Sequence, residues 1–179
     1  MYRRMHVLVE GPDDREFFDA VIRPMLRERY NHVQVWEYAG ETIDRRRDYL
    51  RSIRAMNADY IFVGDFNTSP CLTARRGHFL RCYEPMLDAG RIIVVRAEIE
   101  SWYLAGVDDQ VYRDLGIPVV QHTDNVTKED FERLMPTRFD SVADFMAELL
   151  RGFRPDVART RNRSFCYLMD LLEARSEEV

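Results

Sequence analysis

The first hundred residues alternate between short, almost wholly apolar runs and longer segments whose apolar residues recur at helical spacing. A short apolar run bounded by turn-forming residues is typical of a strand that is buried on both faces. Strands that alternate with helices favour a parallel sheet joined by right-handed crossovers. We therefore predict a three-layer α/β domain over residues 1–106. Its four mainly parallel strands are expected at residues 6–9 (HVLV), 32–38 (HVQVWEY), 60–63 (YIFV) and 91–97 (RIIVVRA).

Residues 107–179 show a different pattern, in which helical spacing dominates. The clearest helix follows Ser141, where apolar side chains recur every three or four residues as far as Phe153. Residues 117–121 are expected to form an edge strand, and Pro155 is expected to begin one last helix. We predict a mostly helical extension that packs against the first domain, so that the two form one compact unit.

The arginine content is the unusual feature of the composition. The chain has 26 basic residues, of which Lys128 is the only lysine, yet its formal net charge is −5. This balance excludes a uniformly basic coat for nucleic acid, although guanidinium groups suit phosphates well. No apolar run is long enough to span a bilayer or to serve as a signal peptide, so we expect a cytoplasmic protein with no membrane partner.

Acidic residues follow three of the four predicted strands. Glu10 follows the first, Asp65 the third, and Glu98 with Glu100 the fourth, while Asp14 opens the helix after the first strand. Carboxyl ends of parallel strands meet at one edge of a sheet, so these carboxylates would repel each other there. A bound Mg²⁺ or Mn²⁺ would remove that repulsion. The alternative is that each carboxylate only caps a helix or forms a turn.

Two of these segments resemble the signatures of a known domain. VEGPDDREFF, at residues 9–18, resembles the first motif of Toprim domains, and GDFN, at residues 64–67, resembles their Asp-x-Asp motif with Asn67 in place of the second Asp. The segment AEIESWYLAG, at residues 97–106, is similar to one in small prokaryotic Toprim-like proteins. Toprim domains have a three-layer, Rossmann-like fold. They serve topoisomerases, primases, a small 5S-rRNA-maturing ribonuclease, and the OLD nucleases that accompany ABC-type ATPases.

The resemblance implies a role for each matching residue. Glu10 would act as the general acid or base, and Asp65 would bind Mg²⁺ or Mn²⁺ together with Asn67. Asp14 could be a further ligand, and Glu98 or Glu100 could complete the metal shell. Apart from the resemblance, Arg75 and Arg76 are the arginines expected to contact nucleic acid, because their loop leaves the same sheet edge as the carboxylates; the alternative is that they too form a solvated face or internal ion pairs. The arginines at 47, 51 and 54 and at 159, 161 and 163 are expected to form solvated faces or internal ion pairs.

Three functions remain open from the sequence. The first is divalent-metal-dependent phosphodiester chemistry on nucleic acid, as a nuclease in DNA or RNA processing or in mobile-element defence. The second, suggested by Asn67, is a catalytically silent Toprim-like module that binds nucleic acid or a partner ABC-type ATPase. The third is a small phosphatase-like or nucleotide-binding α/β protein.

Overall fold

The computed structural model describes residues 2–177, and the chain divides into two compact units, Met1–Val94 and Val95–Val179. The boundary falls within the strand β4 (Ile92–Val95). The sequence pattern instead predicts the domain boundary after residue 106. Helix α5 (Glu100–Ala105) packs with three later helices, α7 (Lys128–Leu134), α8 (Val142–Arg151) and α9 (Pro155–Arg161), and therefore lies in the second unit.

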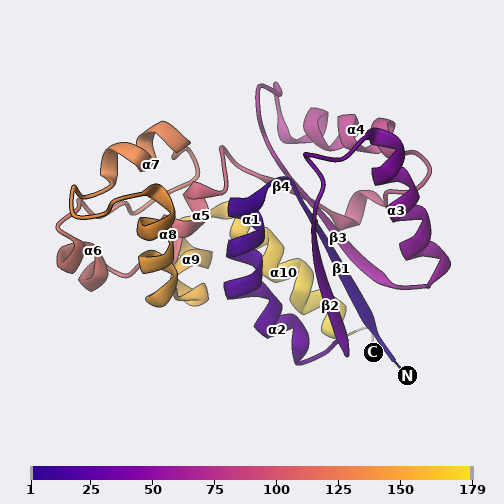
Figure 1. The fold of residues 1–179 in the computed structure, drawn as a ribbon, viewed down its shortest axis with the longest axis horizontal. Helices are drawn as coiled ribbons and strands as arrows, with labels where there is room; N and C mark the ends of the chain where they lie inside the picture. The colour runs from indigo at the N-terminus through magenta and orange to yellow at the C-terminus, as the bar shows by residue number, and fades with distance from the viewer. Residues whose placement is uncertain (1, 178–179) are drawn as a thin grey trace. The chain divides into compact units, whose positions relative to one another are not determined.

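The first unit is built on a four-stranded parallel sheet, which confirms the predicted α/β class (Figure 1). The strand order is β2-β1-β3-β4, and β1 pairs in parallel with both β2 and β3. In this register Val7 lies opposite Val35 on one side and Ile61 on the other. The other three strands are β1 (Arg4–Val9), β2 (His32–Glu37) and β3 (Asp59–Asp65).

Helices cover both faces of this sheet (Figure 1). The segment from β1 to β2 crosses one face, and the next connection returns past β1 to β3 over the other face, as right-handed crossovers require. The first connection contains α1 (Pro12–Phe17), the π-helical turn η1 (Phe18–Ile22) and α2 (Arg23–Arg27). The opposite face carries α3 (Ile43–Ala55) and α4 (Leu72–Tyr83), and the 3-10 turn η2 (Ala89–Arg91) leads into β4.

Pro24 disturbs the first connecting helix. Proline has no backbone N–H and its ring crowds the carbonyl four residues earlier, so a regular α-helix cannot pass through it. The chain accommodates Pro24 by widening the preceding turn into the π-helix η1, in which the N–H of Arg23 donates to the carbonyl of Phe18.

The core on the α3 and α4 face is rich in aromatic side chains. Tyr38 stacks on Phe62 with ring centroids 4.8 Å apart, and Phe79 lies 5.1 Å from Phe62. Gly64 has no side chain because there is no room for one: a Cβ there would lie 2.5 Å from Phe79 and 2.8 Å from the Tyr38 hydroxyl. The close approach of these two rings therefore requires glycine next to Asp65.

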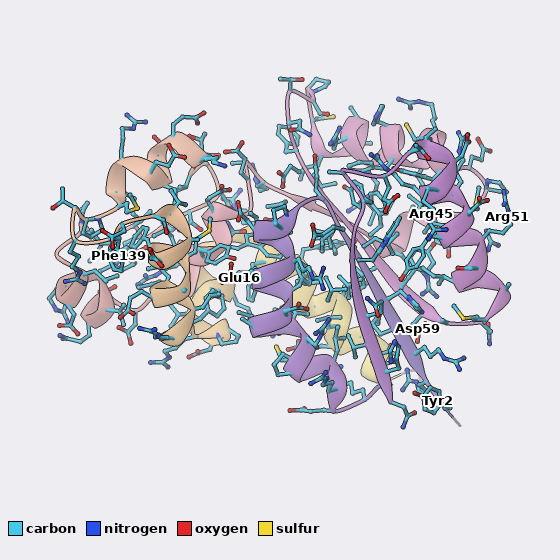
Figure 2. The ribbon with its side chains drawn as sticks, in the orientation of Figure 1. Tyr2, Glu16, Arg45, Arg51, Asp59 and Phe139 are labelled. Atoms are coloured by element: carbon cyan, nitrogen blue, oxygen red, sulfur yellow. The ribbon has the colours of Figure 1, made fainter. Side chains whose placement is uncertain are left out.

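Arginines of α3 bind the main chain of neighbouring segments. Arg47 donates from Nε and Nη2 to the carbonyl of Cys82 at 3.1 and 2.8 Å, and Arg54 donates to the carbonyl of Pro85. Arg51 pairs with Asp48 on the exposed side of the helix, where Figure 2 labels Arg45 and Arg51. The predicted solvated stripe is thus partly a set of hydrogen bonds between α3 and the end of α4.

The second unit is helical and has its own aromatic core. Trp102 and Phe165 meet edge to face at 5.4 Å between centroids, and Phe131 lies 5.0 Å from Phe145. Thr127 and Ser141 cap two of the helices with their hydroxyl groups. Besides α5, the helices are α6 (Asp109–Leu115), α7 (Lys128–Leu134), α8 (Val142–Arg151), α9 (Pro155–Arg161) and α10 (Arg163–Glu177).

Two expectations for this unit are wrong. Residues 117–121 form no strand, and Pro118 leaves this short run with one backbone donor fewer for pairing. The last helix is not continuous, because Asn162 is extended (φ −136°, ψ 117°) and separates α9 from α10.

Within residues 2–177, no helix has the length and apolar character needed to cross a bilayer.

Candidate active site

The strand order places a topological switch point between β1 and β3. The crossover that follows β1 and the crossover that enters β3 lie on opposite faces of the sheet, so a crevice forms beyond the carboxyl ends of these two strands. Glu10 follows β1 directly, and Asp65 is the last residue of β3. Two of the predicted residues therefore stand where ligands bind in open α/β sheets.

Glu10 and Asp65 are in direct contact although 55 residues separate them in sequence. The backbone N–H of Asp65 donates to Oε2 of Glu10 at 3.2 Å. The main chain of Glu10 is fixed as well, since its carbonyl accepts from the N–H of Ala39 at 3.0 Å. Both acidic residues are half-buried. The Glu10 carboxylate is thus oriented by the end of the neighbouring strand.

Asp14 lies at the start of α1, four residues after Glu10. It is 5% exposed, and its Oδ2 accepts from the N–H of Gly11 at 3.1 Å. This bond is the local cap of the helix, so one oxygen of Asp14 has a structural role. Oδ1 of Asp14 and Oδ1 of Asp65 are both shielded from solvent. Gly11 itself is extended (φ −139°), and a Cβ there would come no closer than 3.7 Å to Asp14.

Burial and the negative charges of Glu10, Asp14 and Asp65 all raise the pKa of Tyr38. Its ring is 4% exposed, and its hydroxyl donates to the carbonyl of Val63 at 2.9 Å. Burial, followed by the charge of Glu10 and smaller contributions that include Asp14 and Asp65, holds the pKa of Tyr38 well above its usual value. The hydroxyl therefore stays protonated and keeps donating to the strand beneath the site.

Sequence reasoning missed Tyr38 as part of this site. The signal that could have found it is its place at the end of the second predicted strand. There it shares the carboxyl edge of the sheet with Glu10 and Asp65.

The two arginines predicted to contact nucleic acid are anchored differently. Nε of Arg75 donates to the carbonyl of Asp65 at 2.7 Å, and its guanidinium lies over the Phe79 ring, 4.3 Å from the centroid. Arg76 donates from Nη2 to the carbonyl of Ile92 at 3.5 Å, at the start of β4. Arg75 is therefore held next to Asp65, whereas Arg76 is tied to the next strand. Contact with nucleic acid stays a prediction for both.

Asn67 is exposed, two residues beyond β3, in a left-handed backbone conformation (φ 48°). Asparagine tolerates this conformation better than most residues. The residue type at position 67 thus has a local structural explanation that does not involve a metal.

Glu98 and Glu100 lie in the second unit. Oε2 of Glu98 accepts from the N–H of Lys128, so Glu98 adds to the cap of α7. Glu100 is the first residue of α5 and is 3% exposed. Their participation in a site with Glu10 and Asp65 stays a prediction.

The oxygen atoms of these side chains can be compared with the ligands that a divalent metal ion requires. Among residues 2–177, no group of three His, Cys, Asp or Glu side chains is arranged to hold a metal ion. Mg²⁺ commonly uses only one or two protein carboxylates and retains waters and substrate phosphates as its other ligands. Asp65 supplies one carboxylate at the switch point, and Asp14 and the Asn67 amide stay predicted further donors; so few protein oxygens suit an open site of that kind better than a closed protein cage.

No protein-family model and no curated protein matches the chain. It is similar to two solved structures of the C-terminal region of the Xanthomonas campestris pv. campestris OLD protein. One, phased with platinum, is 16% identical with a TM-score of 0.49, covering 98% of this chain and 97% of that one. The other, phased with iodine, is 16% identical with a TM-score of 0.47, covering 99% of both chains.

The C-terminal region of the Burkholderia pseudomallei OLD protein is also similar, at 14% identity and a TM-score of 0.45 over 97% of each chain. These values describe a distant likeness. The residue roles proposed below rest on the geometry and the motifs of this chain.

Proposed function

We propose that this chain carries out divalent-metal-dependent phosphodiester chemistry on nucleic acid, as a Toprim-type nuclease. The observation that carries the proposal is the hydrogen bond from Asp65 N–H to Glu10 Oε2 at the switch point of the sheet. The two sequence signatures around these residues support the same reading, since they resemble the Toprim motifs in type and order.

Glu10 is the proton-transfer group in this proposal. Its carboxylate is oriented by Asp65 N–H, and its main chain is fixed by Ala39, so it can hold or release a proton at a defined position. Asp65 would hold Mg²⁺ or Mn²⁺, with the Asn67 amide, Asp14 and an acidic residue at position 98 or 100 as further ligands. When bound, such a cation neutralises phosphate oxygens and lowers the pKa of a coordinated water.

Arg75 would bind the phosphate next to the scissile bond. Its Nε is committed to the Asp65 carbonyl and its plane rests on Phe79, which leaves the two terminal nitrogens for a phosphate. The same contact fixes the distance between the guanidinium and the end of β3. Arg76 would add charge nearby.

The test is a cleavage assay with purified protein, Mn²⁺, and single- and double-stranded DNA and RNA. We expect Glu10→Gln to lower the cleavage rate by at least about 100-fold, because a positioned proton-transfer group typically contributes that much. The matched control is Glu16→Gln, an exposed carboxylate on α1 that Figure 2 labels, which should leave the rate unchanged. Cleavage that survives Glu10→Gln would contradict the proposal and indicate a contaminating nuclease.

A second candidate function is a silent Toprim-like module that binds nucleic acid or a partner ABC-type ATPase. It is favoured by Asn67, which removes one negative charge from the motif, and by the lack of a three-carboxylate cluster among residues 2–177. Calorimetry with Mn²⁺ in the presence of nucleic acid separates the two candidates. Binding of nucleic acid with no heat of metal binding and no cleavage would favour the silent module.

A further inference from the structure

The second unit contains a polar cavity that no predicted role explains. It has a volume of about 690 Å³ and lies between α9, α10, the segment 122–125 and the residue that follows β4. Ligand-binding cavities commonly measure roughly 300–1,000 Å³. The lining includes four arginines, at positions 96, 159, 161 and 163.

Three of these arginines are neutralised by acidic side chains of the same unit. Their ion pairs are Arg159 with Asp170 and Glu173, Arg161 with Asp109, and Arg163 with Asp124. Arg96 differs from them. Within residues 2–177, its guanidinium makes no hydrogen bond and no ion pair. The cavity therefore offers one positive group whose donors are uncommitted.

The backbone at Arg96 is held firmly by a buried polar network. Its N–H donates to Oγ of Ser164 at 3.2 Å, and its carbonyl accepts from Oγ of Ser101 at 3.3 Å. Ser164 is fixed in turn by Asn162, whose Oδ1 accepts from Oγ of Ser164 at 2.7 Å. Ala97, the next residue, has a φ of 56°, which alanine rarely adopts. Such a conformation persists only where the surrounding structure imposes it.

The opposite wall is also fixed. The N–H of Thr123 donates to the carbonyl of Arg161 at 3.0 Å, and the N–H of Arg163 donates to Oδ1 of Asp124 at 2.8 Å. These bonds tie the segment 122–125 to the junction of α9 and α10. Tyr167, on α10, lines the same cavity with 39% of its surface exposed. The cavity thus has rigid walls and an accessible aromatic side chain.

We propose that this cavity binds one nucleotide unit, with Arg96 on the phosphate and Tyr167 against the base. A guanidinium fork suits phosphate oxygens, and an exposed tyrosine ring stacks on any base. Asn125 and Thr160, which also line the cavity, can hydrogen-bond to sugar or base groups. The volume exceeds what a phosphate alone requires. This site needs no metal and is additional to the function proposed above.

The experiment measures binding to the full chain in the presence of EDTA, with two probes: adenosine 5′-monophosphate and a short single-stranded DNA oligonucleotide. We expect Arg96→Ala to weaken binding at least about tenfold, which is the effect of losing one charge-assisted contact. The matched control is Arg151→Ala, an exposed arginine of the same unit that lies outside the cavity and should leave binding unchanged. Arg96→Lys should fall between wild type and Arg96→Ala, because lysine keeps the charge but loses the fork.

A second measurement locates the ligand. Cys166 lines the cavity and is partly exposed, whereas Cys71 is exposed in the first unit, and both are free thiols. We expect the bound probe to slow alkylation of Cys166 and to leave Cys71 unaffected, as followed by mass spectrometry of the peptides.

The results of the binding and alkylation experiments can be distinguished from those of the cleavage assay. If only the mononucleotide binds and protects Cys166, the ligand is a free nucleotide. If the oligonucleotide binds more tightly, the ligand is a nucleic-acid strand. The inference is overturned if neither probe binds, if Arg96→Ala and Arg151→Ala have equal effects, or if Cys71 alone is protected. Loss of cleavage in Glu10→Gln has no bearing on these readings, because no metal is present in them.

Discussion

At the scale of the residue, the surroundings of His6 shift its pKa strongly. It lies in the middle of β1, is 6% exposed, and its Nδ1 is 2.9 Å from the Tyr49 hydroxyl. Burial, and then the positive charges of His32 and Arg4, lower the pKa of His6 to about 4. His6 is therefore neutral in the folded chain at neutral pH.

This shift predicts how the stability of the first unit depends on pH. The unfolded chain binds a proton at His6 below the ordinary histidine pKa of 6.5, whereas the folded chain binds it only near pH 4. The free energy of unfolding should therefore fall by about 3 kcal/mol as the pH drops from 6.5 to 4, since one pKa unit corresponds to ~1.4 kcal/mol. Urea unfolding at a series of pH values measures this fall in the free energy of unfolding.

The variant His6→Leu should remove this part of the pH dependence, whatever its effect on stability at neutral pH. His122→Gln, which changes an exposed histidine, should retain the dependence. An unchanged slope in His6→Leu would show that other groups produce it.

The sequence predicts that Glu10 and Asp65 lie close together, but it does not predict that Tyr38 belongs to the same site. Both residues end apolar runs, and parallel strands bring such ends to one edge, so their proximity follows from local pattern and sheet type. Tyr38 ends a run as well, but the burial of its ring against Phe62 depends on the strand order and on the absence of a side chain at Gly64. Neither can be derived from periodicity alone.

At the scale of the element, the break between α9 and α10 depends on one side chain. Asn162 is 1% exposed, and its Oδ1 accepts from the N–H groups of Ser164 and Phe165 at 3.1 and 3.0 Å. Its Nδ2 donates to Oγ1 of Thr123 at 3.0 Å. The residue therefore caps α10 and links it to a distant loop.

We expect Asn162→Ala to lower the free energy of unfolding by about 2 kcal/mol or more, because it leaves several buried polar groups without partners. The matched control is Ser141→Ala, which removes the exposed cap of α8 and should cost about 1 kcal/mol. Chemical denaturation of the two variants gives the comparison. Equal losses would mean that the buried network adds nothing beyond an ordinary cap.

The same break shows where element prediction fails. Pro155 and the apolar residues after it predict one helix, and α9 does begin at Pro155. Asn162 interrupts it because the side chain satisfies the backbone groups that a continuing helix would have used. The four strands were predicted because their apolar runs are bounded by turn residues. Residues 117–121 have a similar run but form no strand, and Pro118 removes one of the few backbone donors that pairing could use.

At the scale of the whole molecule, metal and substrate should bind together. Because no three acidic side chains among residues 2–177 are arranged to hold a metal ion, most ligand positions of a divalent cation would fall to waters and phosphate oxygens. The affinity for Mn²⁺ should therefore rise at least about fivefold when an uncleavable phosphorothioate oligonucleotide is present, and the oligonucleotide should bind more tightly by the same factor with Mn²⁺.

Calorimetric titration of each ligand in the presence and absence of the other measures this coupling. Asp65→Ala should abolish it, and the exposed control Glu16→Gln should retain it. Tight Mn²⁺ binding without oligonucleotide would instead require a closed set of protein ligands.

The arginines that join α3 to the end of α4 have a practical consequence for mapping nucleic-acid contacts. Phenylglyoxal footprinting assumes that guanidinium groups become inaccessible only when a ligand covers them. Here Arg47 is already engaged with the Cys82 carbonyl through two nitrogens, and Arg54 with that of Pro85. Modification of either guanidinium would remove these hydrogen bonds and loosen α3 from the end of α4, whether or not a ligand is bound. Contacts are therefore better mapped by cross-linking from the nucleic acid than by reagents that attack arginine.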